Sequence, residues 1–331
     1  MFDVITIGTA SRDAFLKSEV FKSVSSPEFI SGTALCLPAG AKINISDMVF
    51  STGGGATNAA VTFSRQGYHT AVVCRIGDDV SGREVLSNLK SEGVSTGFVV
   101  EDEKLKTAYA MIILSDSGER TVLVFRGASD SFKTSDINLK LIQAKWIYIA
   151  GSLPVEILKL ILNHARQNNI KVAMNPSASQ IKLGLNGFGE IIKKLSVLIM
   201  NREEGALLTG IKYGSVLDIF KKLDDYVGGV VVLTDGPKGV LVSDGQKMYQ
   251  AGIYKEKAIV DRTGAGDAFG SGFVASLMVE PNNIERAIKL ASANATSVVE
   301  AVGAKTGILS KKIFENEARW RELKILTKDL L

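Results

Sequence analysis

Residues 260–269 read Val-Asp-Arg-Thr-Gly-Ala-Gly-Asp-Ala-Phe and carry more structural information than any other stretch of the chain. Small and apolar residues recur after it at Ala268, Phe269, Gly272 and Phe273, a spacing that predicts a helix beginning at the glycines. At a helix start, backbone N–H groups point outward and the helix dipole adds partial positive charge. The stretch therefore predicts an anion-binding turn at Thr263, Gly264, Ala265 and Gly266.

Asp267 is out of place in such a turn, because a carboxylate repels an anion. Its presence makes sense if it takes the proton from a hydroxyl group that attacks a phosphoryl group. The alternative is a plain glycine-rich helix start, with Asp267 as an acid in the first turn. The residues alone leave both interpretations open.

A second glycine-rich segment, Ser-Thr-Gly-Gly-Gly-Ala-Thr-Asn, occupies residues 51–58. It is not a P-loop, because no Gly-Lys-Ser/Thr follows, and it lacks the G-x-G-x-x-G of dinucleotide-binding folds. Asn58 could offer its amide to a polyhydroxyl ligand. The alternative is a packed turn before a helix of small residues.

Three further segments follow strand-like runs. Residues 77–82 suit a turn and a helix N-cap. Asn201 and Glu204 could hold Mg²⁺ through water, since this ion keeps most of its waters beside a phosphate, or they could cap a helix. Residues 234–239 could lie against the ribose and phosphates of a nucleotide, or form a tight hairpin.

Short apolar runs alternate with helical patterns along the chain. Strands are expected at residues 4–8, 71–76, 146–150, 171–174, 197–200 and 230–234, and helices at 58–66, 155–168 and 216–226. This alternation predicts an α/β fold with a parallel sheet and helices on both faces. In such folds ligands bind beyond the carboxyl ends of the strands.

Two regions depart from this alternation. Residues 109–115 and 121–126 read as a β-hairpin, and residues 14–52 lack helical periodicity. Together they could form a small sheet beside the ligand cleft, which is a candidate lid. The alternative is two surface excursions without a shared role.

Composition argues against several classes of protein. The 331 residues are 46% hydrophobic and 22% charged, and the net charge of +4 is too small and too scattered to indicate nucleic-acid binding. Two cysteines indicate a reducing compartment. Neither a signal peptide nor a membrane span is expected, so we expect a cytoplasmic protein. Residues 311–328 mix Lys, Arg and Glu and predict a solvated amphipathic helix.

These motifs occur together and in order, and over about residues 1–308 the chain resembles the ribokinase-like (PfkB) family of carbohydrate kinases. The match lies in the Gly-Gly motif with Asn58, in Gly77-Asp78, and in residues 261–269, which resemble the family pattern Asp-Thr-Thr-Gly-Ala-Gly-Asp. The resemblance implies one Rossmann-like three-layer α/β/α domain over residues 1–331, with a β-sheet lid formed by about residues 14–52 and 98–128. It also implies transfer of the γ-phosphoryl group of ATP, with Mg²⁺, to a hydroxyl group of a sugar or sugar-like molecule.

The resemblance also implies roles for individual residues. Asp267 matches the catalytic base, and Gly264, Ala265 and Gly266 match the anion hole. Asp261 and Gly303 match a region where many relatives bind a monovalent cation such as K⁺. The substrate wall would comprise Asp13, Gly54, Gly55 and Asn58, and the nucleotide would contact Asn175, Asn201, Glu204, Thr234, Gly236, Gly239, Thr263 and Asn294, with Glu204 holding Mg²⁺ through water.

Departures from the family pattern bear on the substrate. Gly55 stands where ribokinases carry Lys, and residues 151–154 lack the acid found there, which argues against ribose itself. Arg262 replaces a common Thr and has no assigned role. A neutral sugar or a nucleoside is expected rather than a sugar phosphate. The rivals are a nucleoside or sugar-phosphate kinase of the same fold and a non-catalytic ligand sensor, against which the intact Asp267 argues. A homodimer through the lid is the expected assembly, with no nucleic acid or membrane as partner.

Overall fold

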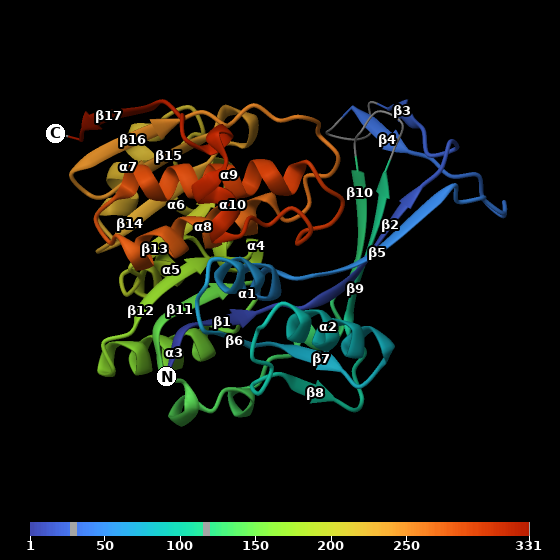
Figure 1. Ribbon diagram of the computed structural model, residues 1–331, viewed down its shortest axis with the longest axis horizontal. Helices are drawn as coiled ribbons and strands as arrows, with labels where there is room; N and C mark the ends of the chain where they lie inside the picture. Colours follow the sequence, from blue (N-terminus) through green and yellow to red (C-terminus); the bar gives the residue numbers. More distant parts are fainter. Residues whose placement is uncertain (27–31, 115–119, 331) are drawn as a thin grey trace.

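A nine-stranded sheet forms the centre of the larger part of the molecule in the computed structural model, which describes residues 1–26, 32–114 and 120–330 (Figure 1). Its strands lie in the order β17-β16-β15-β14-β13-β12-β11-β1-β6. The strands are β1 (Phe2–Gly8), β6 (Thr70–Val73), β11 (Ala144–Ala150), β12 (Lys171–Asn175), β13 (Val197–Asn201), β14 (Val230–Thr234), β15 (Val240–Ser243), β16 (Lys247–Ala251) and β17 (Ile325–Asp329).

The run from β6 to β14 is parallel, as the alternation predicted, whereas β15, β16 and β17 pair antiparallel at one edge. For β15 the reason is the length of its connection to β14. Only a short 3-10 turn, η4 (Gly236–Lys238), joins β14 to β15, and a parallel crossover needs a dozen or more residues. The sheet is therefore mixed rather than wholly parallel.

Helices cover both faces of this sheet, which confirms the three-layer α/β/α expectation (Figure 1). One core cluster packs α3 (Val155–Gln167), α5 (Gly184–Ile192), α6 (Arg202–Thr209) and α7 (Val216–Asp224) against the sheet. The other face carries α1 (Gly55–Arg65), α8 (Ala265–Val279) and α9 (Ile284–Val299). Central strands are buried on both sides, so their sequences read as apolar runs. The remaining helices are α2 (Val80–Ser91), α4 (Ala178–Ile181) and α10 (Lys311–Asn316).

A second sheet of four strands, ordered β10-β9-β2-β5, stands away from the main sheet (Figure 1). Its strands are β2 (Ser11–Lys17), β5 (Asp47–Gly53), β9 (Ala108–Leu114) and β10 (Arg120–Phe125). Antiparallel pairing of β9 with β10 confirms the predicted hairpin. We call these four strands the small sheet.

The borders of the small sheet differ from the expected lid. Strand β2 begins at Ser11, ahead of residue 14. Strand β8 (Val100–Asp102), which falls within the expected segment 98–128, pairs with β7 (Arg75–Gly77) and not with the small sheet. A further short pair, β3 (Ser23–Ser25) with β4 (Thr33–Leu35), lies at its far end (Figure 1). Residues 27–31 and 115–119 of the expected lid lie outside the described residues.

The amphipathic helix predicted over residues 311–328 is wrong. Helix α10 ends at Asn316, a 3-10 turn follows at η5 (Ala318–Trp320), and β17 completes the segment. Trp320 is 3% exposed and packs edge-on against Tyr254, with ring centroids 5.2 Å apart. Burial of this ring and pairing of β17 with β16 outweigh the helical propensity of the segment.

Within the described ranges, no helix has both the length and the apolar character needed to cross a membrane.

Candidate active site

Asp267 lies in the first turn of α8 and is held by Asn58 in the first turn of α1. The Nδ2 atom of Asn58 donates to Oδ2 of Asp267 at 2.8 Å. Burial raises the pKa of Asp267, and the hydrogen bond from Asn58 and the charge of Lys305 act in the opposite direction. The result is a fixed carboxylate at the N-terminus of a helix, with a pKa shifted toward that of a useful base.

The turn before α8 has the backbone that the glycines suggested. Gly264 precedes the helix with φ 79°, in the left-handed region. A Cβ atom there would lie 2.4 Å from the Cβ of Ala304, so both the conformation and the space require glycine. Gly266 is exposed at the start of the helix, where its amide is open to a ligand.

Asp261 joins this turn to the loop after α9. Its Oδ1 atom accepts hydrogen bonds from the backbone N and the Oγ1 of Thr263, at 2.9 and 2.7 Å. Its Oδ2 atom accepts from the backbone N of Gly303 at 3.0 Å. The structure therefore brings together Asp261 and Gly303, the two residues expected near a monovalent cation.

A cavity of ≈ 200 Å³ opens beside the turn. It lies at the carboxyl end of β14 and reaches α9, so it brings the segment at 234–239 to the anion-binding turn. It collects three predicted nucleotide residues, Thr234, Gly236 and Gly239. The rest of the lining comprises Pro237, Ile253, Glu256, Arg262, Ala265, Gly266, Phe269, Ser292, Ala295, Thr296 and Val299.

Sequence reasoning missed the wall that α9 contributes to this cavity. Ser292, Ala295, Thr296 and Val299 follow the spacing of one helix face, which was the available signal. Asn294 was placed at the nucleotide instead, and the structure does not bring it there. It is 0% exposed, donates to the carbonyl of Ala268 at 2.8 Å and accepts from Leu309 N at 2.8 Å. Two residues along a helix turn a side chain to the opposite side, so Asn294 joins helices inside the core.

Asn201 and Glu204 form a reciprocal cap at the start of α6. The Oδ1 atom of Asn201 accepts from the backbone N of Glu204 at 2.8 Å, and Asn201 N donates to Oε2 of Glu204 at 2.9 Å. Burial raises the pKa of Glu204. Asn175, Asn201 and Thr234 end the neighbouring strands β12, β13 and β14, so all three lie along the same edge of the sheet.

No group of three or more His, Cys, Asp or Glu side chains among the described residues is arranged to hold a metal ion. One half-buried carboxylate at Glu204 suits an ion such as Mg²⁺ that takes most of its ligands from water and phosphate, and it does not suit a closed protein cage. The side chain of Asn175 is committed to the protein, since its Nδ2 donates to the carbonyl of Ile199 at 3.0 Å.

The other predicted wall lies where the two sheets meet. Asp13 is 4% exposed, and its Oδ1 accepts from Ser11 Oγ at 2.8 Å. Burial raises its pKa, with Ser11 and Lys305 opposing the rise. Gly54 has φ 99°, and a Cβ atom there would lie 2.5 Å from Ala10. Gly55 leaves room for Asp267 and Ala150, because a Cβ atom at Gly55 would lie 3.3 Å from Oδ1 of Asp267 and 2.9 Å from the Cβ of Ala150.

A second cavity of ≈ 140 Å³ opens at this junction, between the first strands and the small sheet. Thr9, Ala10 and Gly54 line it from the main body, and Ser11 lines it from the start of β2. Tyr109 and Phe125, which are register partners on β9 and β10, also contribute to its lining. The full lining also includes Ala108, Ala110, Val124, Arg126, Ser129 and Asp130, none of which was predicted as a site residue.

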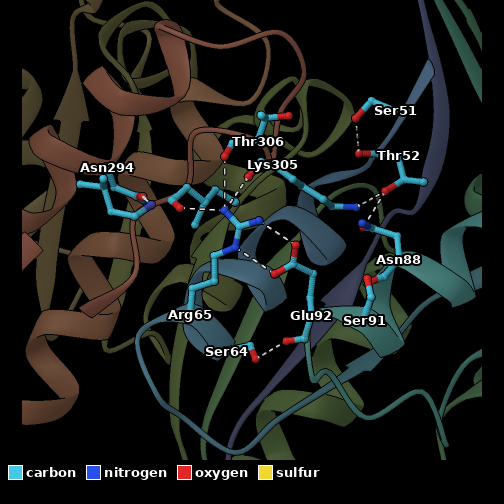
Figure 2. Close-up of polar contacts among 12 residues, drawn as sticks. Ser51, Thr52, Ser64, Arg65, Asn88, Ser91, Glu92, Asn294, Lys305 and Thr306 are labelled. Atoms are coloured by element: carbon cyan, nitrogen blue, oxygen red, sulfur yellow. Dashed lines mark hydrogen bonds and ion pairs between the residues drawn. The ribbon is translucent and has the colours of Figure 1, made fainter. Parts of the chain in front are cut away.

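Lys305 was also missed. It is 4% exposed, and its Nζ donates to Oγ1 of Thr52 at 2.7 Å (Figure 2). Burial lowers the pKa of Lys305 to about 7, while Asp13, Cys74, Glu92 and Asp267 act to raise it. A lysine between small residues in Gly-Ala-Lys-Thr-Gly was the only sequence signal.

Known proteins resemble the chain over most of its length. The family described as "pfkB family carbohydrate kinase" matches residues 7–311. A ribokinase of Bacillus subtilis is 27% identical over 321 residues, which cover 95% of this chain and 99% of that protein. A cytidine kinase of Thermococcus kodakarensis is 28% identical over 305 residues, covering 92% and 98%. The structure of Arabidopsis thaliana ribokinase complexed with ribose and ATP superposes with a TM-score of 0.79 at 21% identity, covering 97% of this chain and 99% of that one.

Proposed function

Because this chain belongs to the pfkB family of carbohydrate kinases, we propose that it transfers the γ-phosphoryl group of ATP to a hydroxyl group of a sugar or sugar-like molecule, with Asp267 as the base. The chain is a kinase that phosphorylates an alcohol. What we propose is the class of its acceptor and the role of each site residue. The observation that supports it best is the carboxylate of Asp267, which Asn58 holds at 2.8 Å in the first turn of α8.

In this proposal ATP lies in the cavity beside α9, and its γ-phosphate reaches the N-terminus of α8. The backbone amides of Gly264, Ala265 and Gly266 stabilise charge on the transferring group. The acceptor oxygen attacks phosphorus, the bond to the ADP oxygen breaks, and the hydroxyl proton passes to the carboxylate of Asp267. A pKa raised by burial makes that carboxylate a stronger base at neutral pH.

Asp13, Gly54, Gly55 and Asn58 form the acceptor side of the site. The buried carboxylate of Asp13 accepts hydrogen bonds from hydroxyl groups and can take two at once. Asn58 has two tasks, because its Nδ2 already holds Asp267. Its Oδ1 is buried and has no hydrogen-bond partner among the described residues, which supports an acceptor hydroxyl as the missing donor.

Two kinds of cation fit this proposal. Glu204 would hold Mg²⁺ through water, with Asn201 beside it, and the ion would neutralise charge on the ATP phosphates. A monovalent cation such as K⁺ would lie near Asp261 and Gly303. The three hydrogen bonds that the Asp261 carboxylate already accepts leave the carbonyl oxygens of the two loops as the further ligands there.

We also propose that the small sheet closes over the acceptor as a lid and pairs with a second copy of the chain. Large apolar side chains on two of its strands are exposed, among them Phe50 at 49%, Leu123 at 52% and Phe125 at 55%. An uncovered apolar sheet face of this kind favours association.

A nucleoside is the second candidate acceptor. A cytidine kinase of Thermococcus kodakarensis is 28% identical to this chain, and the small apolar residues Ala108, Ala110 and Val124 line the cavity between the sheets, where the distal group of an acceptor would lie. The sugar part of a nucleoside would then lie toward Asp13 and Asp267. This candidate shares the chemistry of the first and differs only in the distal group of the acceptor.

The test is an ADP-release assay with Mg–ATP and K⁺ on ribose, fructose, 2-keto-3-deoxygluconate, adenosine, inosine, cytidine and fructose 6-phosphate. We expect turnover of a neutral sugar or a nucleoside. Asp267→Asn keeps the size of the side chain and removes the base, so we expect turnover to fall by about 10²–10⁴. Turnover close to wild type in this variant would remove Asp267 from the mechanism, and no turnover of any acceptor would contradict the proposed function.

A further inference from the structure

Lys305 has no role in the mechanism above, yet it is buried beside the site. Within the described residues, the only hydrogen-bond partner of its ammonium group is Thr52, whose Oγ1 lies 2.7 Å away. The Oγ1 atom of Thr52 in turn donates a hydrogen bond to Oδ1 of Asn88 at 2.8 Å (Figure 2). Burying an ammonium with a single neutral partner is costly, so this position calls for a function.

The main chain at Lys305 belongs to the phosphate side of the site. Ala304 packs against Gly264, and Gly303 donates to Asp261 at 3.0 Å. The loop that carries Lys305 therefore lies directly behind the anion-binding turn. A shift of this loop would displace Gly264.

Arg65 and Glu92 fix the same loop to the body of the protein. Arg65, the last residue of α1, donates to the carbonyls of Lys305 at 3.0 Å and Ile308 at 2.8 Å. Glu92 holds the guanidinium at 2.9 and 2.7 Å (Figure 2). These contacts hold the main chain of Lys305 in place, so its side chain extends from a fixed position.

The ammonium end reaches the acceptor side. Thr52 is the next-to-last residue of β5, an edge strand of the small sheet. Strand β5 pairs with β2, and Ser51 lies opposite Asp13 in that pairing. The side chain of Lys305 thus spans from the loop behind the anion-binding turn to the strand beside the acceptor carboxylate.

We propose that Lys305 is a positioning residue that ties β5 of the small sheet to the loop behind the anion-binding turn, so that the two halves of the site are ordered together. This inference rests on the kinase function proposed above. Coupling of this kind is reciprocal. A nucleotide that orders residues 263–266 also orders β5, and an acceptor that draws β5 inward steadies the turn.

Hydrogen–deuterium exchange with the Mg²⁺ complex of the ATP analogue AMP-PNP tests this coupling between β5 and residues 263–266, and it does not require the acceptor to be known. In the wild type, the analogue is expected to slow amide exchange both at residues 263–267 and at residues 47–53. In Lys305→Met and in Thr52→Val, the effect at 263–267 should remain and the effect at 47–53 should disappear. Thr52→Ser is the matched control, because it keeps the hydroxyl group and should keep both effects.

Several results would overturn the inference. If AMP-PNP slows amide exchange in β5 equally in the wild type and in Lys305→Met, the Lys305 side chain does not couple β5 to the nucleotide site. If protection at residues 263–267 is lost in Lys305→Met as well, Lys305 serves only to stabilise its own loop. The same conclusion holds if Lys305→Met does not fold while Thr52→Val behaves as wild type. If AMP-PNP does not bind the wild type, the kinase proposal itself fails and the inference falls with it.

Steady-state kinetics give a second readout, with the compound of the panel that the wild type phosphorylates. Lys305→Met and Thr52→Val should each raise the acceptor KM at saturating ATP by about 10-fold, since each removes the same buried hydrogen bond. Because the coupling is reciprocal, the KM for ATP at saturating acceptor should rise by a similar factor. The double variant should be no worse than the poorer single one. Additive effects, or a rise in only one of the two KM values, contradict the coupling.

Discussion

Asn58 controls how strongly Asp267 holds a proton, because its amide stabilises the charged form of the carboxylate. Asp267 has a pKa raised by burial, so activity is expected to be lost as the pH falls through a value above the 3.8 of an ordinary aspartate. In Asn58→Leu the amide is gone, the pKa rises further, and the acidic limb of kcat/KM should move to higher pH. A pH–rate profile of the two proteins measures this, and an unmoved limb would separate Asn58 from the base.

Gly264 is a position where one methyl group should be harmful. Gly264→Ala places a Cβ at φ 79° and 2.4 Å from the Cβ of Ala304. We expect it to cost about 1–2 kcal/mol from the backbone conformation alone and to raise the KM for ATP. Gly214→Ala is the control, since φ is not positive there and a Cβ would have nothing within 4 Å. Urea unfolding and ATP kinetics of both variants check this, and equal stability would mean that the turn adapts.

At the residue scale, the sequence was most informative where a residue broke a local rule. Asp267 in an anion-binding turn and the glycines before it stood out in this way. Lys305 could not be predicted, because its burial depends on Thr52, more than two hundred residues away in the chain. Asn294 was misplaced because a helix pattern does not tell which polar residue points into the core.

At the scale of elements, Arg65 and Glu92 should contribute measurably to stability. Their side chains are 25% and 19% exposed, and Arg65 also satisfies carbonyls of the loop after α9. We expect Arg65→Met to lower the free energy of unfolding by about 1.5–3 kcal/mol, the range for hydrogen bonds to charged groups.

The matched control is Arg83→Met, which removes an ion pair with Asp78 whose side chains are 62% and 61% exposed. That change should cost less than about 1 kcal/mol, as exposed pairs generally do. Urea unfolding measures both variants. Similar losses would show that the Arg65 contacts add nothing beyond a surface pair.

The strands and helices were predicted best where local pattern and tertiary environment agree. The parallel strands are buried on both faces and are flanked by amphipathic helices, so periodicity identified them. Strand β17 has no such pattern, and its four exposed residues resemble a solvated helix. It is a strand because β16 offers an open edge, which no local property of residues 325–329 reveals.

At the scale of the whole molecule, the small sheet predicts a dimer that depends on its apolar residues. Leu123→Glu places a charge on β10 where the side chain is 52% exposed. The variant should sediment as a monomer, whereas Leu217→Glu on α7, 50% exposed in the native chain, should leave the assembly unchanged. Analytical ultracentrifugation distinguishes them. A wild type that is monomeric at all concentrations would contradict the proposed pairing.

Very short connections join the small sheet to the main body, and this affects how the protein could be re-engineered. Strand β1 ends at Gly8 and β2 begins at Ser11, while β5 ends at Gly53 and α1 begins at Gly55. Each of these two crossings therefore runs through residues that line the cavity between the sheets, which is the proposed acceptor site. Replacing the small sheet with that of a relative would cut the chain at this cavity. Acceptor preference is better redesigned one side chain at a time, on the cavity-facing side of β9 and β10. The connections between β1 and β2 and between β5 and α1 should keep their native residues.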